Sequence, residues 1–156
     1  MSNDSPLAGQ VLVVEDNPVN LNVITKLLQR FGLNPDIAKD GLEGLKAVED
    51  KQYDLILMDI QMPKMDGYST TQYIRQELGL NVPIIATTAH AFSGEREKCL
   101  RYGMNEYISK PIEEKELLTL IQSFTKSNKR NRDLLSTVER ESVTDKFDLQ
   151  YLMDIS

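Results

Sequence analysis

Short apolar runs alternate with longer segments of helical periodicity along the first three quarters of the chain. Such runs are typical of strands buried on both faces of a sheet. The segments between them place apolar residues three and four positions apart, which is the spacing of one helix face. The predicted strands are QVLVVED, NPDIA, YDLILMD, VPIIATTA and NEYISK, and a predicted helix follows each of them.

Local signals mark where several of these helices begin and end. In the first helix, Asn17 can cap the start, Pro18 takes the first helical position and Gly32 can close the end. Asp40 and Glu43 have the spacing of a capping box before the second helix. The predicted apolar faces of the first and last helices are Ile24, Leu27, Leu28 and Phe31, and Leu117, Leu120, Ile121 and Phe124.

This alternation predicts the fold class. Apolar strands that alternate with helices form a parallel sheet covered on both faces. Five strand–helix units are too few for a closed eight-stranded barrel. We therefore predict an α/β, flavodoxin-like, doubly wound five-stranded parallel sheet of order 2-1-3-4-5, with active groups at the carboxyl ends of the strands.

Changes of composition along the chain also predict its domain organisation. Residues 1–9 are small and polar and suggest a flexible lead-in, and the strand–helix units fill residues 10–126. Residues 127–142 are polar and basic or mixed, as in a linker. Residues 143–156 bring apolar side chains back in a segment too short to bury them alone.

Composition narrows the class of protein. The net charge of −6 and the pI near 4.9 argue against a general nucleic-acid binder, which needs a basic face. No apolar run approaches the roughly 18 residues of a membrane span, and the start lacks signal-peptide features. The single cysteine, Cys99, excludes an internal disulfide and fits a reducing, cytoplasmic location. We expect Cys99 to be a plain surface or half-buried thiol.

Acidic residues stand at the ends of two predicted strands. Glu15 and Asp16 end the first strand, and Asp59 ends the third. Neighbouring parallel strands bring these carboxylates together, where their charges repel. Mg²⁺ would remove the repulsion, because it prefers oxygen ligands and keeps positions for water and phosphate. The sequence therefore predicts a Mg²⁺ site at this edge of the sheet.

Two further strand ends add a hydroxyl and a cation. Thr87 and Thr88 end the fourth strand, and Lys110 ends the fifth. An acid nucleophile, a metal, a hydroxyl and a lysine on one edge form a phosphoryl-transfer site. Each residue also has a structural explanation, since Asp59 or Asp66 could be a turn or cap residue. Four consecutive strand ends of this kind favour the site.

The segments VLVVEDN, DLILMDIQMPKMDG, PIIATTAHA and YISKP, in this spacing, resemble the receiver domain of two-component response regulators. The resemblance covers residues 10–126, and MDIQMPKMDG followed by TAHA is most similar to receivers of hybrid sensor histidine kinases. It implies a phosphorelay role with a sensor histidine kinase or histidine phosphotransfer domain as partner. A homodimer through helix four, strand five and helix five is a further implied contact.

The resemblance assigns roles at the acceptor and metal site. Asp59 corresponds to the phosphoacceptor, which takes a phosphoryl group from a histidine. Glu15 and Asp16 correspond to the acidic pair that binds Mg²⁺ together with Asp59. The backbone carbonyl of Gln61 corresponds to the remaining protein ligand. In the same loop, Pro63 is expected to stiffen the chain and Gly67 to loosen the start of the third helix.

The resemblance also assigns the switch residues. Thr88, in preference to Thr87, corresponds to the hydroxyl that turns toward the phosphoryl oxygen. Lys110 corresponds to the lysine that pairs with the phosphoryl group, and its bond to Pro111 is cis in relatives. Tyr107 corresponds to the aromatic switch position. His90, like Gln61, falls where relatives tune the lifetime of the phosphoryl group.

Several alternatives stay open at this stage. The chain could be a stand-alone response regulator or a protein-binding receiver that is not phosphorylated. A haloacid dehalogenase phosphatase needs an Asp where Gln61 stands, and a flavodoxin needs a phosphate loop in place of EDNPVN. FDLQYLMDIS resembles the opening of a histidine phosphotransfer domain, or is a plain amphipathic tail. Enzymatic activity beyond self-phosphorylation and dephosphorylation would belong to a parent histidine kinase.

Overall fold

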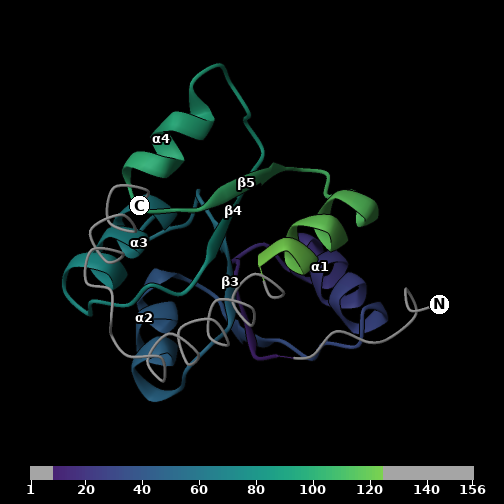
Figure 1. Cartoon of the computed structure of the whole chain (residues 1–156), viewed down its shortest axis with the longest axis horizontal. Coiled ribbons are helices and arrows are strands. Elements are labelled where there is room, and N and C mark those ends of the chain that lie inside the picture. The colour runs from purple at the N-terminus through teal and green to yellow at the C-terminus, as the bar shows by residue number, and fades with distance from the viewer. Residues whose placement is uncertain (1–8, 125–156) are drawn as a thin grey trace, which may run out of the picture. The chain divides into compact units, whose positions relative to one another are not determined.

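The computed structural model describes residues 9–124. Most of the predicted lead-in, the linker 127–142 and the tail 143–156 lie outside the described residues. Five parallel strands form one sheet of order β2-β1-β3-β4-β5, which confirms the predicted flavodoxin-like topology (Figure 1). The strands are β1 (Val11–Val14), β2 (Asp36–Ala38), β3 (Leu55–Asp59), β4 (Ile84–Thr88) and β5 (Glu106–Ser109).

Helices cover both faces of this sheet. They are α1 (Pro18–Arg30), α2 (Gly41–Asp50), α3 (Gly67–Gln76), α4 (Glu95–Arg101) and a helix over residues 114–124. Apolar side chains of α1 and of the helix 114–124 pack against one face. Those of α2, α3 and α4 pack against the other face. Among the described residues, each helix is too short or too polar to cross a membrane.

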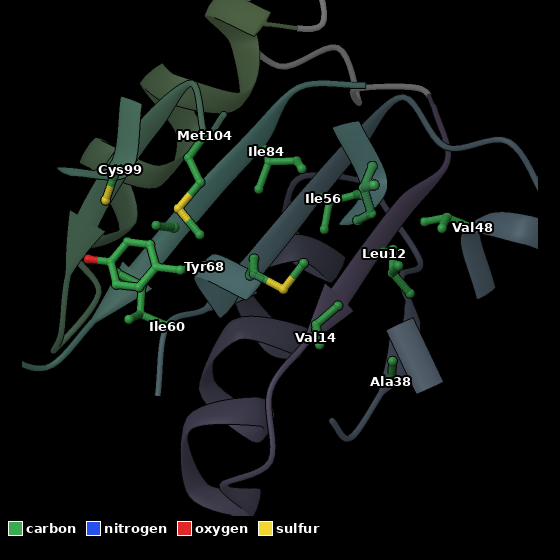
Figure 2. Close-up of a cluster of buried hydrophobic side chains, with 13 residues drawn as sticks. Leu12, Val14, Ala38, Val48, Ile56, Ile60, Tyr68, Ile84, Cys99 and Met104 are labelled. Carbon is green, nitrogen blue, oxygen red and sulfur yellow. The ribbon is translucent and has the colours of Figure 1, made fainter. Parts of the chain in front are cut away.

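The strands build the core because their side chains alternate between the two faces. Leu12 and Val14 of β1 join the apolar cluster under α2, α3 and α4, which Figure 2 shows. Val11 and Val13 join the cluster under α1 and the helix 114–124. The three central strands are therefore apolar at nearly every position until they reach the carboxyl edge. That edge is held by a sheet that is buried on both sides.

The predicted helix signals are confirmed. The Asn17 side chain accepts hydrogen bonds from the N–H groups of Val19 and Asn20, and Pro18 begins α1. The Asp40 side chain accepts from the N–H of Glu43 at 2.9 Å. In return, the Glu43 side chain accepts a hydrogen bond from the N–H of Lys39, one residue before the cap, at 2.8 Å.

Two expectations about single residues are wrong. Gly67 does not loosen the start of α3, because a Cβ atom there would lie 2.4 Å from the carbonyl oxygen of Asp59. The glycine permits close packing, and its N–H donates to the carbonyl of Ile60 at 2.9 Å. Cys99 is neither exposed nor half-buried: it is fully buried under α4. The charged neighbours Arg96, Glu97 and Arg101 are exposed, whereas Cys99 and Glu95 lie on the buried side of the helix, so composition alone could not place Cys99.

Candidate functional site

Three carboxylates meet at the carboxyl edge of the sheet. Glu15 directly follows β1, Asp16 comes next, and Asp59 ends the neighbouring strand β3. One ligand oxygen from each lies within 4.8 Å of the others. Glu15 and Asp59 are only 1% and 3% exposed, whereas Asp16 is exposed to solvent. The predicted acidic cluster is therefore assembled.

Lys110 balances part of this charge. It follows β5, and its Nζ lies 3.0 Å from Oε1 of Glu15 and 3.2 Å from Oδ1 of Asp59. Its own N–H donates to the carbonyl of Thr88 at 2.7 Å, which ties the end of β5 to the end of β4. The bond between Lys110 and Pro111 is cis, as the family resemblance implies. One lysine thus contacts both buried carboxylates.

The donor set fits a divalent cation. Burial, and then the neighbouring charge of Glu15, raise the pKa of Asp59 to about 7, although Lys110 acts in the opposite direction. The contact of Glu15 Oε1 with Lys110 lacks hydrogen-bond geometry, so this buried oxygen has no hydrogen-bond partner in the described structure. Two crowded carboxylates and an exposed third, all oxygen donors, are the ligands that Mg²⁺ prefers.

The two threonines at the end of β4 differ in their surroundings. Thr87 lies opposite Asp59 in the register between β3 and β4, and its buried hydroxyl has no partner in the described structure. Thr88 follows it, and its hydroxyl oxygen accepts the N–H of His90 at 3.0 Å. The Thr88 hydroxyl therefore closes a turn within its own loop, and any rotation of this side chain must break that bond.

The remaining predicted residues surround this edge. The N–H of Gln61 donates to Oδ1 of Asp59 at 3.3 Å, and the Gln61 side chain is exposed. His90 is exposed on the loop after β4. Tyr107 on β5 is partly buried and packs against the apolar cluster of Figure 2. The chain thus brings Gln61 to Asp59, whereas no direct contact joins Tyr107 or His90 to the carboxylates among the described residues.

The loop between β3 and α3 has a fixed shape. Asp66 caps α3 by accepting the N–H of Ser69 at 2.8 Å, so its capping interpretation is confirmed. The N–H of Met65 donates to the carbonyl of Pro63 at 2.7 Å across a tight turn. Lys64, at the centre of this turn, has a φ of 68°, a conformation uncommon for a side chain with a Cβ. The loop beside Asp59 is therefore constrained by a tight turn at Lys64 and by the cap where α3 begins.

A buried polar group close to this loop escaped the sequence analysis. Glu95, the first residue of α4, is 2% exposed, and its carboxylate accepts a hydrogen bond from the hydroxyl of Tyr68. Cys99 lies on the same side of α4, with Sγ 4.0 Å from Oε2 of Glu95. The spacing of Glu95 and Cys99, four positions apart on one helix face, was the only signal for it in the sequence.

Fold and site together define a class: an α/β protein with a cluster of carboxylates and a lysine at the carboxyl edge of its parallel sheet. The family model of the response regulator receiver domain matches residues 11–122 of this chain. The chain belongs to that family.

Known proteins support the same assignment. The chain is 43% identical over 119 residues to hybrid signal transduction histidine kinase G of Dictyostelium discoideum, covering 74% of this chain and 4% of that protein. It is 45% identical to the receiver domain of sensor histidine kinase PA1611 from Pseudomonas aeruginosa PAO1, with a TM-score of 0.70 and coverage of 77% and 99%. That structure has a magnesium ion coordinated in its active site cleft.

A third comparison involves a complex. The receiver domain of Ssk1 from Saccharomyces cerevisiae, solved with the histidine phosphotransfer protein Ypd1, matches with 27% identity, a TM-score of 0.70 and coverage of 76% and 90%. The chain spans only 4% to 15% of the length of the first curated relatives that it matches. These relatives are named as histidine kinases, and their matching parts are a small fraction of each protein.

Proposed function

We propose that this chain is the phosphoacceptor of a two-component phosphorelay, with Asp59 as the residue that takes the phosphoryl group. The observation that carries the proposal is the position of Asp59, a buried carboxylate beside Glu15, Asp16 and Lys110. A strand end holds this nucleophile rigidly, and rigid positioning is the main protein contribution to phosphoryl transfer. Membership of the receiver family supports the same role.

In the proposed reaction, a carboxylate oxygen of Asp59 attacks the phosphorus of a phosphohistidine. The P–N bond breaks, and the imidazole nitrogen leaves with the electron pair and takes up a proton. Lys110 is already 3.2 Å from Asp59 and would pair with the transferred phosphoryl group. Thr88 would turn its hydroxyl toward a phosphoryl oxygen, and Tyr107 would respond as the aromatic switch.

Glu15, Asp16, Asp59 and the carbonyl of Gln61 would hold Mg²⁺. When bound, the ion would neutralise the carboxylates and the phosphoryl oxygens, which otherwise repel each other. The magnesium ion of the PA1611 receiver supports this choice of metal. The crowding that raises the pKa of Asp59 is relieved by such an ion, so the same observation explains why a cation belongs there.

We further propose that the chain works within a hybrid sensor histidine kinase. The matches to histidine kinases over a small part of their length support this context. A phosphotransfer domain is the proposed partner, and the Ypd1–Ssk1 complex supports that pairing for a related receiver. The segment 143–156, as the start of such a domain, belongs to the same proposal and lies outside the described residues.

Intact-mass measurement tests the acceptor role. Wild type, Asp59→Asn and Asp66→Asn are incubated with acetyl phosphate, with and without Mg²⁺. We expect one added phosphoryl group on wild type and on Asp66→Asn, because asparagine still caps α3. We expect none on Asp59→Asn or without Mg²⁺. Wild type that stays unmodified and does not bind beryllium fluoride would instead be a protein-binding receiver without phosphoryl chemistry.

A further inference from the structure

Apolar contacts hold α4 less firmly than the other helices. The helix has only seven residues, and Gly94 at its start provides no side-chain cap. Its buried residues are Glu95 and Cys99, and Leu100 is 42% exposed. A short uncapped helix with so little buried apolar surface is marginal by itself. The position of α4 therefore depends on the few contacts that its buried residues make.

Two side-chain contacts of α4 in the described structure are polar and charged: an exposed ion pair from Arg96 to Glu106 of β5, and the buried hydrogen bond from Tyr68 to Glu95. The buried one is the stronger constraint, since solvent screens the exposed pair. A buried carboxylate is costly unless hydrogen bonds compensate it, and the Tyr68 hydroxyl supplies such a bond. Tyr68 is itself buried, and the proximity of Glu95 adds to burial in raising the pKa of its hydroxyl. Figure 2 shows Tyr68 and Cys99 at the same end of the apolar cluster. This hydrogen bond fixes the start of α4 against α3.

Tyr68 is joined closely to the acceptor residue. It follows Gly67, which packs directly on the backbone of Asp59. Its ring is held by Tyr102, with ring centroids 4.8 Å apart, and by Lys98, whose Nζ lies 4.6 Å from the ring centroid. The Tyr68 side chain is therefore held in a fixed position relative to the end of β3.

Glu95, the acceptor of this hydrogen bond, is linked along the chain to Thr88. Glu95 is connected through residues 89–94 to Thr88, whose hydroxyl accepts the N–H of His90. If Thr88 turns toward a phosphoryl group, it must release that N–H, and the segment 89–94 and the start of α4 must adjust. Beside Tyr68 lies an open surface pocket of about 490 Å³, to which α4 contributes Lys98. It is lined by Ile60, Gln61, Met62, Pro63, Asp66, Tyr68 and Lys98.

We propose that the Tyr68–Glu95 hydrogen bond is an autoinhibitory latch that holds α4 in its resting position and slows phosphorylation. The proposal rests on the function proposed above for Asp59. The latch connects the strand end that carries the acceptor to the helix that follows the switch threonine. Breaking it leaves the Glu95 carboxylate buried with only the weak, distant thiol of Cys99 as donor, and movement of α4 toward solvent relieves that penalty. Release of α4 and readiness for phosphorylation are therefore coupled.

Hydrogen exchange of the full chain tests the latch without any phosphodonor. Tyr68→Phe keeps the ring and removes the hydroxyl, and Tyr73→Phe, at a 40% exposed position of the same helix, is the matched control. We expect the amides of α4 to exchange about tenfold faster in Tyr68→Phe than in wild type, because the lost bond is to a charged group. Unchanged exchange in α4, or an equal increase in α1, would overturn the latch.

The phosphorylation rate with acetyl phosphate and Mg²⁺ is the second readout. Tyr68→Phe should be phosphorylated several-fold faster than wild type, and Tyr73→Phe at the wild-type rate. A rate for Tyr68→Phe at or below that of wild type would reject the latch and leave Asp59 as the acceptor. No adduct on wild type would reject the proposed function instead, so the two failures are distinguishable.

Discussion

At the scale of single residues, the proposed acceptor site is locally destabilising. Asp59 ends a buried strand next to Glu15, where a charged carboxylate is destabilising without a cation. Lys110 offsets only part of this cost, since the pKa of Asp59 is still raised to about 7. Strain of this kind is common where a folded protein holds a reactive group ready. It makes the stability of the domain depend on pH and on one side chain.

Replacing Asp59 with asparagine should stabilise the cation-free protein by about 1–3 kcal/mol at pH 8. The pKa of Asp59 is about 7 in the folded state and near 3.8 ordinarily, so its favourable contribution is complete below pH of about 4. That contribution is lost as the pH rises through about 7. Urea unfolding at pH 5 and pH 8, without divalent cations, measures the difference.

Asp66→Asn is the control for this measurement. Asp66 is an exposed cap of α3, and asparagine caps a helix about as well as aspartate does. Its effect should therefore not grow between pH 5 and pH 8. An Asp59→Asn difference that stays constant or shrinks with increasing pH would contradict a raised pKa in the folded state.

The candidate site divides into residues that the sequence could predict and residues that it could not. Glu15, Asp16, Asp59 and Lys110 come together because each ends a strand or follows one within two residues, and the order of parallel strands decides which ends are neighbours. The contact of Tyr68 with Glu95 depends instead on how two helices pack. The four-residue spacing of Glu95 and Cys99 puts them on one helix face but does not say which face is buried, so a buried carboxylate in a charged stretch could not be distinguished from a solvated one.

At the scale of secondary structure elements, local chemistry decided the helix starts. Asn17, Asp40 and Asp66 cap their helices through side-chain bonds to backbone N–H groups, and this signal is readable in sequence. The role of Gly67 could not be predicted from the sequence. A glycine is needed there because a Cβ would collide with the backbone of Asp59, and this contact arises only from tertiary packing.

One arginine attaches the end of α3 to the loops that lead into β4 and β5. Arg75 donates from Nε to the carbonyl of Gly103 at 2.9 Å and from Nη1 to the carbonyl of Leu80 at 2.9 Å. Its Nη2 donates to Oδ1 of Asn105 at 3.0 Å, and the same oxygen accepts the N–H of Ile84 at 2.8 Å. One partly buried guanidinium group thus donates three hydrogen bonds.

Arg75→Met should lower the free energy of unfolding by about 2–4 kcal/mol, because three hydrogen bonds are lost while the apolar stem is kept. Arg30→Met is the matched control. Arg30 pairs with Glu114 at 2.8 Å, but its side chain is 66% exposed, so its loss should cost about 0–1 kcal/mol. Urea unfolding followed by circular dichroism compares them, and equal losses would contradict the bracing role of Arg75.

At the scale of the whole described domain, apolar layers on both faces of the sheet fix the position of its polar carboxyl edge. Buried strand residues form separate clusters on the two faces of the sheet, and helices cover both. The carboxyl ends of β1 and β3 are therefore fixed by the core and cannot separate to relieve their charge. Above the pKa of Asp59, where protonation no longer relieves the repulsion, cation binding can do so, and cation binding and global stability must therefore be linked.

Mg²⁺ should accordingly raise the Tm of the wild-type chain, approaching about 2.7 kcal/mol of added stability at a hundred times its Kd. Asp16→Asn removes a carboxylate that is exposed to solvent, so it should leave the cation-free Tm nearly unchanged while it weakens the Mg²⁺ response. Potassium chloride at matched ionic strength controls for screening. Since screening acts on charges anywhere on the surface, an equal rise in potassium chloride, or an undiminished rise in Asp16→Asn, would show that the stabilisation does not arise at the acidic cluster.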